Sequence, residues 1–202
     1  MSSQPLTFRP AVSTHEDGVI FARYMDVAAD GGFRKMFGPR FEEIVATAFR
    51  HPNHDLSYEY ALFAELDGTV VGMASAYSAE RYAQFSDAVL QRAAGRSAFR
   101  IACILTLIAP MWRFLHSYEQ GDFYLQFLAV DEAHRGRGIG RALMNEMESR
   151  GRRYECTRFA LDVSGRNPDA QRLYERQGLH VEARWPRLRI LPAAVLRMAK
   201  TL

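Results

Sequence analysis

The sequence predicts a mixed α/β domain in which helices flank a central β-sheet. Two β-rich runs at 58–66 and 69–77 are joined by Asp67-Gly68, a dipeptide typical of tight hairpins. Residues 122–150 lead from an apolar strand through a turn rich in Gly and Arg into a helix. Residues 158–184 have the pattern of a strand, a short helix and another strand. Strands that alternate with helices in this way indicate crossover connections within the sheet.

The other elements follow in chain order from apolar spacing and capping signals. Thr14, with Asp17 three residues later, resembles a capping box at the start of a first helix, which Gly31-Gly32 ends. Gly178 closes the short helix near the C-terminus. We therefore expect a strand at 6–11, helices at 15–28 and 39–49, the two hairpin strands, helical segments across 80–119, a strand at 122–130, a helix at 139–150, a strand at 158–163, a helix at 168–177, and strands at 179–184 and 194–198.

We interpret the helical segment 80–119 as an insertion between the third and fourth strands. It has no Pro-, Gly- or Ser-rich boundaries, and the chain shows no internal repeat. A chain of 202 residues is long enough for one domain with a substantial core. We therefore expect a single domain over residues 1–202.

The composition excludes several classes of protein. The net charge is only +3, and the 26 basic residues, all arginine apart from Lys35 and Lys200, form no block, so we expect no nucleic-acid partner. Cys103 and Cys156 lack the spacing of a zinc site or a disulfide framework, and we expect no metal. Cys103 lies in an apolar run and is predicted to be buried. Residues 1–5 lack the features of a secretory signal, which favours the cytoplasm.

One apolar run, Ile101 to Met111, needs a separate explanation. It lies between Arg100 and Arg113 and contains Pro110. A bilayer requires about 20 apolar residues, so this run is too short to span one, and we expect no membrane partner. The run is predicted to form a buried helix or a cover over an active site.

The turn between 130 and 141 is the most informative segment for ligand binding. Glycine lets the backbone approach a ligand closely, and free amides at a helix start favour an anion. Arg135, Arg137 and Arg141 add positive charge, so the turn is predicted to cradle a pyrophosphate. The dinucleotide pattern GxGxxG fails at Arg141 and Leu143, and no Gly-Lys-Ser/Thr completes a P-loop. A plain β-α turn with glycines for tight packing is the simpler alternative.

Two motifs resemble the signatures of the GCN5-related N-acetyltransferase (GNAT) superfamily. Arg135-Gly136-Arg137-Gly138-Ile139-Gly140 is similar to its [Q/R]-x-x-G-x-[G/A] signature, and Leu128-Ala129-Val130 resembles the strand end before it. Asn167 and the segment 170–179 resemble its second signature, N-x-x-A-x-x-[LF]-Y-x-x-x-G-F, with Leu179 in place of the usual Phe. The resemblance implies a GNAT-like splayed sheet whose strands 122–130 and 158–163 part to admit acetyl-CoA.

The resemblance also implies roles for individual residues. Backbone groups of Leu128 and Val130 would pair with the pantetheine arm, and the Val130 amide would polarise the thioester carbonyl. Asn167 would bond the arm from the opposite side. Tyr174 would act as the general acid that protonates the departing thiolate, or would only pack its helix. The pyrophosphate would be held by the amides of Arg137, Gly138, Gly140 and Arg141.

The general base stays open at this point. Histone acetyltransferases of this superfamily carry a glutamate six residues before the Val130 position, where this chain has Tyr124. Gln126 is the next residue on the same face and is not a carboxylate either. Glu119, Asp122 or an ordered water would have to take the proton.

The acceptor is expected to bind between residues 27–37 and the insertion. The insertion is rich in aromatic residues, which would exclude water and favour a small-molecule amine, or would instead form core or a homodimer interface. His116 would line this pocket or lie on the surface. The expected function is direct acetyl transfer from acetyl-CoA to that amine. Two alternatives are a non-catalytic CoA-binding module and an acyltransferase for longer acyl-CoAs. The aromatic residues are Tyr82, Phe85, Phe99, Trp112, Phe114 and Tyr118.

Overall fold

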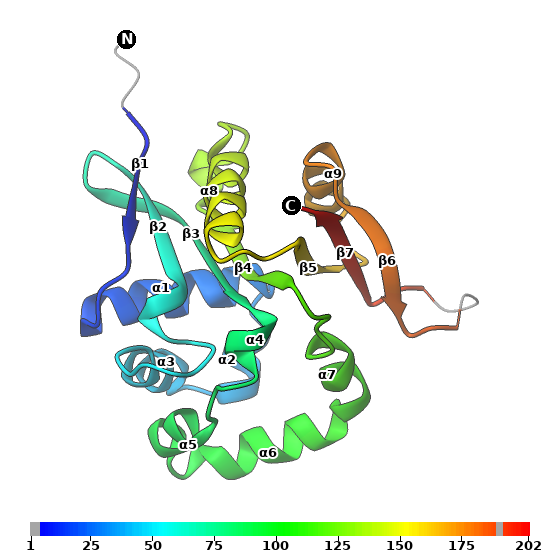
Figure 1. Cartoon of the computed structure of the whole chain (residues 1–202). Helices are drawn as coiled ribbons and strands as arrows, with labels where there is room; N and C mark the ends of the chain where they lie inside the picture. Colours follow the sequence, from blue (N-terminus) through cyan, green and yellow to red (C-terminus); the bar gives the residue numbers. More distant parts are fainter. Residues whose placement is uncertain (1–4, 189–191) are drawn as a thin grey trace.

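A computed structural model describes residues 5–188 and 192–202 and confirms the mixed α/β class (Figure 1). Residues 1–4, which entered the argument about a secretory signal, lie outside the described residues. The described residues form a seven-stranded sheet in the order β1-β2-β3-β4-β5-β7-β6. Its strands are β1 (Thr7–Pro10), β2 (Ala61–Leu66), β3 (Thr69–Ser78), β4 (Asp122–Val130), β5 (Arg158–Ser164), β6 (His180–Trp185) and β7 (Val195–Thr201).

The helices lie close to the predicted positions, with two differences. A short helix, α2 (Gly32–Phe37), begins at the second glycine of the predicted break, and the predicted helix at 39–49 begins only at Phe41. The predicted strand at 58–66 begins at Ala61, because Ser57 caps a 3-10 turn, η1 (Tyr58–Tyr60). The α-helices are α1 (His15–Ala28), α2 (Gly32–Phe37), α3 (Phe41–Phe49), α4 (Ala79–Tyr82), α5 (Ala88–Ala94), α6 (Ser97–Leu107), α7 (Ala109–Leu115), α8 (Ile139–Arg153) and α9 (Pro168–Arg176).

The predicted hairpin turn and the predicted helix cap both form, but the Asp17 side chain has a different hydrogen-bond partner from the one predicted. Asp67 and Gly68 both have positive φ, 50° and 72°, as a tight hairpin turn requires. The Thr14 hydroxyl accepts from the Asp17 amide and so caps α1. The Asp17 carboxylate does not complete a capping box. It accepts instead from the Val12 amide at 2.8 Å and from Arg9, and thereby ties β1 to α1.

The sheet has a separate core on each face. One core joins α1, α2 and α3 to inward residues such as Phe63, Met73 and Phe127. The other joins α8 and α9 to the opposite face through residues such as Leu143 and Phe159. Figure 1 shows α1 and α3 on one side of the sheet and α8 on the other. The insertion forms helices α4 to α7, which continue the layer of α2 and α3 beyond the end of β3.

Strands β4 and β5 pair only at their beginnings. They run parallel, and the paired positions extend from Asp122 with Arg158 to Leu125 with Leu161. Beyond Leu125 the two strands separate, and Figure 1 shows α8 and α9 standing on either side of the gap. The splayed sheet implied by the family resemblance is therefore present.

The apolar run in the insertion is only partly buried, so the prediction of a buried helix is wrong, while the alternative of a cover over an active site stays a prediction. Ile101 is 7% exposed, but Leu107 is 82% exposed, and Phe99, which precedes the run on the same helix, is 80% exposed. Cys103, which was predicted to be buried, is exposed as well. The error has a simple cause, because α6 lies at the edge of the molecule and turns only one side inward. Among the described residues no single helix is long and apolar enough to cross a membrane, and α6 and α7 reach that length only as a pair bent by 87°.

Candidate active site

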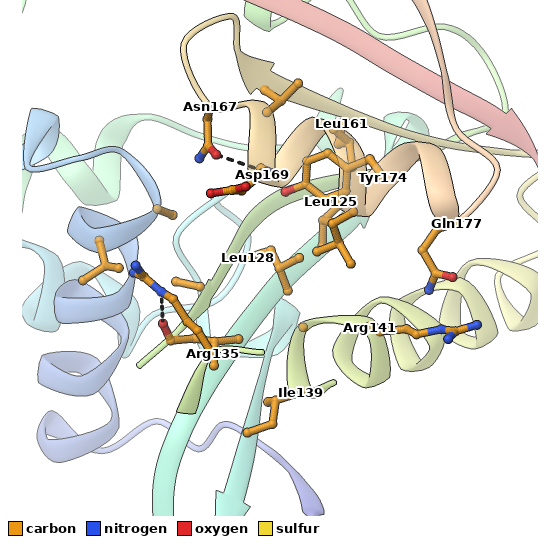
Figure 2. Close-up of a pocket in the computed structure, with 18 of the residues that line it drawn as sticks. Leu125, Leu128, Arg135, Ile139, Arg141, Leu161, Asn167, Asp169, Tyr174 and Gln177 are labelled. Atoms are coloured by element: carbon orange, nitrogen blue, oxygen red, sulfur yellow. Dashed lines mark hydrogen bonds between the residues drawn. The ribbon is translucent and has the colours of Figure 1, made fainter. Parts of the chain in front are cut away.

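A cleft of about 840 Å³ opens where β4 and β5 part, and α8 and α9 form its walls (Figure 2). The structure brings almost all of the predicted site residues to this cleft, although they come from three separate segments. Arg137 is the exception and does not line it. The predicted residues that do are Leu128, Ala129, Val130, Arg135, Gly136, Gly138, Ile139, Gly140, Arg141, Asn167 and Tyr174.

The cleft side of β4 offers backbone groups that β5 does not use. The Asp131 amide donates to the Val71 carbonyl at 2.9 Å, so position 131 faces β3. Backbone groups alternate in direction along an antiparallel strand, and positions 127 and 129 therefore also face β3. Leu128 and Val130 point the other way, toward the edge that β5 has left. An extended ligand chain could add to this edge as a strand does.

A bulge in β4 lies at the point where β4 and β5 separate. Ser75 of β3 pairs with Phe127, and Ala76 pairs with Leu125, which leaves Gln126 as the extra residue. The bulge interrupts the alternation of side chains, since Leu125 packs in the core beneath α8 and Phe127 in the core beneath α1. Gln126 thereby reaches the boundary between the cleft and the α1 side of the sheet.

The glycine turn leaves space for a ligand. Gly136 and Gly138 have φ of 74° and 83°, a left-handed conformation that other residues adopt only with strain. A Cβ added to either would meet no atom of the described residues within 4 Å, so these residues leave open space above the turn. Gly138 is the N-cap of α8 and brings no side-chain cap, which leaves the first amides of the helix available. Such amides bind phosphates well.

Two polar residues at the cleft have structural partners. The Asn167 side-chain oxygen accepts from the Ala170 amide at 3.0 Å and caps α9. Its amide group remains to serve as a donor toward the cleft. Arg135 donates from Nε to the Val130 carbonyl at 3.2 Å, which holds its guanidinium against the end of β4 (Figure 2).

Tyr174 reaches from α9 into the space between α9 and β4 (Figure 2). It is 8% exposed, and burial raises the pKa of its phenol to about 12. The phenol therefore keeps its proton across the neutral range. A protonated hydroxyl at this point can donate a proton to a leaving group, although a buried phenol is a weaker acid than a free one.

The two carboxylates considered as bases lie elsewhere. Asp122 is buried at the start of β4, where it accepts from Arg158 Nε at 2.9 Å and from the Glu119 amide. Glu119 is largely exposed and contacts the same Arg158 at 3.0 Å. Both lie at the paired end of β4 and β5, and neither lines the cleft.

A second cavity of about 210 Å³ adjoins the cleft on the α1 side of the sheet. Its walls come from α1, α2, α6 and α7, together with the loop before β2. Ala28, Gln126 and Asp162 line both spaces. His116 and Trp112 line the second cavity, as one of the sequence hypotheses allowed. We refer to it as the inner chamber.

One carboxylate between cleft and chamber is neutralised. Asp162 accepts from Arg197 at 2.9 and 2.6 Å and from the Tyr124 hydroxyl at 3.0 Å. Burial still raises the pKa of Asp162, with the contacts of Arg197 opposing that shift. Arg197 also donates to the Phe114, Leu115 and Ser117 carbonyls, and so fastens the end of α7 to the sheet.

Asp55 is the residue that the sequence analysis missed. The segment 51–55 has the composition of a polar loop, yet His54 is 2% exposed and Asp55 lines the inner chamber. Gln126 donates to the Asp55 carboxylate at 3.2 Å. Burial raises the pKa of Asp55. No local signal marks this carboxylate, because 71 residues separate it from Gln126 in the chain.

Among residues 5–188 and 192–202, no group of His, Cys, Asp or Glu is arranged to hold a metal ion.

Comparison with known proteins agrees with this geometry. The model of the "Acetyltransferase (GNAT) family" matches residues 31–179. "Acetyltransferase Atu2258" from Agrobacterium fabrum is 42% identical over 59 residues, which is 29% of this chain and 42% of that protein. This chain thus matches less than half the length of that relative.

Solved structures show a similar fold across nearly the whole chain. An N-acetyltransferase from Staphylococcus aureus Mu50 has a TM-score of 0.69 at 17% identity, covering 96% of this chain and all of that one. A chain of the NatC complex, solved with Gag peptide and CoA, has a TM-score of 0.56 at 13% identity and covers 98% of both chains. Since the family model spans well over half of its residues, the chain belongs to the GNAT family of acetyltransferases.

Proposed function

We propose that this protein transfers an acetyl group from acetyl-CoA to the amine of a small molecule. The observation that carries the proposal is the coincidence of three features at one cleft: an open strand edge, a ligand-sized gap above two left-handed glycines, and a protonated tyrosine. Membership of an acetyltransferase family makes acyl transfer the natural chemistry of such a site.

The cleft residues fit the parts of acetyl-CoA in order. The amides that begin α8 would hold the pyrophosphate, with Arg135 and Arg141 at the rim of the turn. Leu128 and Val130 would pair with the pantetheine arm along the open edge of β4. The Asn167 amide group would donate from α9. The NatC complex has been solved with CoA, which is consistent with a GNAT fold holding this molecule.

The chemistry follows from that placement. A neutral amine attacks the thioester carbon, and the carbonyl oxygen gains negative charge that the Val130 amide would stabilise. The C–N bond forms and the C–S bond breaks. Tyr174 would give its proton to the departing thiolate, and the attacking nitrogen would lose one proton in exchange. The products are an N-acetylated amine and CoA.

Binding and turnover test this proposal separately. A ligand that binds only the native state raises the melting temperature, so acetyl-CoA is expected to stabilise the protein. Thiol release in the presence of amines then reports transfer. No shift with acetyl-CoA, free CoA or a longer acyl-CoA would contradict every CoA-based function. A shift without thiol release would favour a non-catalytic module, and a larger shift and faster release with longer chains would favour a different acyl donor.

A further inference from the structure

The inner chamber combines apolar walls with a small polar end. Its walls include Met25, Phe33, Met36, Leu105 and Leu115. The polar end is formed by residues that touch the cofactor cleft or lie beside it, namely Asp55, Gln126, Tyr77, Tyr118, Tyr124 and Asp162. At about 210 Å³ the chamber is smaller than the roughly 300–1,000 Å³ of typical drug-sized pockets. Its size suits a compact molecule.

Asp55 forms no ion pair with a lysine or arginine among the described residues. The nearby groups that can carry a positive charge are His54 and His116, and His116 is hydrogen-bonded through Nδ1 to the Trp112 carbonyl at 2.9 Å. His54 is held as a neutral ring, because Nε2 contacts the Ala48 carbonyl at 2.8 Å and Nδ1 accepts from the Leu56 amide at 3.2 Å. Burial also lowers the pKa of His54. His54 therefore positions the loop that carries Asp55 without neutralising its carboxylate.

Gln126 has an unused acceptor beside the same carboxylate. Its Nε2 donates to Asp55, while its Oε1 is buried and has no hydrogen-bond partner among the described residues. A buried carbonyl oxygen without a donor is costly, so a ligand that supplies an N–H is favoured. The rings of Tyr77, Tyr118 and Tyr124 pack together at this end with centroid separations of 4.6–6.1 Å. Aromatic rings also attract a cation.

These contacts call for one positive, hydrogen-donating group on an otherwise apolar body. The proposal rests on the proposed function, whose acceptor amine it specifies. We propose that the acceptor is a primary monoamine with an aromatic or aliphatic body, that its nitrogen binds between Asp55 and Gln126, and that Asp55 removes the proton that makes the nitrogen nucleophilic.

The same contacts disfavour other amines. No Lys or Arg lines the described chamber, so the carboxylate of an amino acid would be buried without a partner. Arg197, the cation nearest in the network, is already committed to Asp162. A polyamine or aminoglycoside would bring several charges, whereas Asp55 is the one chamber carboxylate without a guanidinium partner in the described part of the chain.

The incoming ammonium gives one proton to the Asp55 carboxylate and becomes a neutral amine. The amine attacks the thioester, the C–S bond breaks, and the sulfur receives the proton from Tyr174. The nitrogen then loses a second proton, which restores Tyr174 through solvent, and Asp55 releases its proton to water. The net reaction converts ammonium and thioester into amide, thiol and one proton.

Three acceptors with related structures test the substrate class. 2-Phenylethylamine has the expected apolar body and a single positive charge. Phenylalanine has the same body with an added carboxylate, and spermidine is a linear chain that carries several positive charges. We expect kcat/KM for phenylethylamine to exceed the other two by at least about tenfold, because each of the others buries an unpaired charge. Equal or faster acetylation of phenylalanine or spermidine would overturn the proposal.

Variants test the residues. Asp55→Asn keeps the volume and the contact with Gln126, and should lower turnover of phenylethylamine roughly 10²- to 10⁴-fold, the range of general acid–base catalysis. Calorimetry should show weakened binding of phenylethylamine and unchanged binding of acetyl-CoA. Glu119→Gln is the matched control, since Glu119 is exposed and lies at the other end of β4. It should behave as the parent protein.

A second variant guards against loss of folding. Leu105→Trp fills the chamber from α6, and should weaken phenylethylamine binding while acetyl-CoA binding and the far-UV spectrum stay unchanged. Wild-type turnover in Asp55→Asn, or undiminished amine binding in Leu105→Trp, would contradict the proposal. If acetyl-CoA binds and another amine class is preferred, only this inference fails. If acetyl-CoA does not bind, the proposed function fails, and amine calorimetry still shows whether the chamber holds a monoamine.

Discussion

The cleft between α8 and α9 and the inner chamber lie on opposite sides of one bulge and are built by different means. The cleft takes its character from backbone: a free strand edge, left-handed glycines and the start of a helix. The chamber depends on side chains from several helices, strands and loops, among them Asp55, a carboxylate without a guanidinium partner in the described part of the chain. A backbone site tolerates many sequences but depends on a few glycines. A side-chain site determines which molecule enters.

Tyr174→Phe removes the hydroxyl at which the two sites are expected to cooperate. Burial raises the pKa of Tyr174 to about 12, so the phenol is available as an acid at neutral pH. We expect kcat to fall by roughly 10²- to 10⁴-fold, with little change in acetyl-CoA affinity. Stopped-flow thiol detection and calorimetry measure the two quantities. An unchanged kcat would remove Tyr174 from the mechanism and leave it a packing residue of α9.

Gly138→Asp tests the glycine turn that is expected to bind the pyrophosphate. Asp tolerates a left-handed conformation better than most residues, but it would add a negative charge where the pyrophosphate is expected. Two unit charges about 4 Å apart near a protein surface repel by about 4 kcal/mol, so we expect acetyl-CoA binding to weaken by roughly 2–4 kcal/mol.

Gly68→Asp is the control for that experiment. Gly68 also has positive φ, and a Cβ added there would meet no described atom within 4 Å, but it lies in the β2–β3 hairpin. It should retain acetyl-CoA affinity by calorimetry. Equal losses in both variants would show that the Gly138 effect comes from folding rather than from the pyrophosphate.

Asp55→Asn should raise thermal stability while it lowers turnover. Burial raises the pKa of Asp55 in the folded state above its unfolded value, so the folded protein binds the proton more tightly. The charged form of Asp55 therefore destabilises the folded protein. The full penalty applies at a pH above the folded-state pKa, and no penalty applies below the ordinary Asp pKa of about 3.9. The gain in melting temperature should be largest at a pH above the raised pKa of Asp55 and vanish near pH 4. A gain that is independent of pH would show that another contact is responsible.

Leu107→Ser should produce the smallest effect, because Leu107 lies on the outer side of α6 and is 82% exposed. We expect the free energy of unfolding to change by no more than about 0.5 kcal/mol, as is usual for exposed positions. Ile101→Ala, on the inner side of the same helix, should cost about 2–4 kcal/mol. Chemical denaturation measures both. A large effect at Leu107 would mean that the outer side of α6 is covered in solution.

The difference between the cleft and the inner chamber also explains which parts of the site could be predicted from the sequence. The cleft is encoded locally, by the turn around Gly138 and the segment around Tyr174, and each motif carries its own conformational requirement. Asp55 could not be found in this way, since its environment depends on α1, α6 and β4 meeting it in space. Burial of Cys103 was predicted wrongly for the same reason, because an apolar run shows that a helix can be buried but not which of its sides is.

The bulge at Gln126 has a mechanical consequence. Reaction between two bound molecules requires their reacting atoms to stay aligned while the surrounding helices fluctuate. Gln126 would contact one molecule through its side chain, and Leu128, two residues along the same strand, would contact the other through its backbone. The spacing between the two partners would then be fixed by covalent geometry within one strand. Motion of α6 and α7 could widen or narrow the entrance without changing that distance.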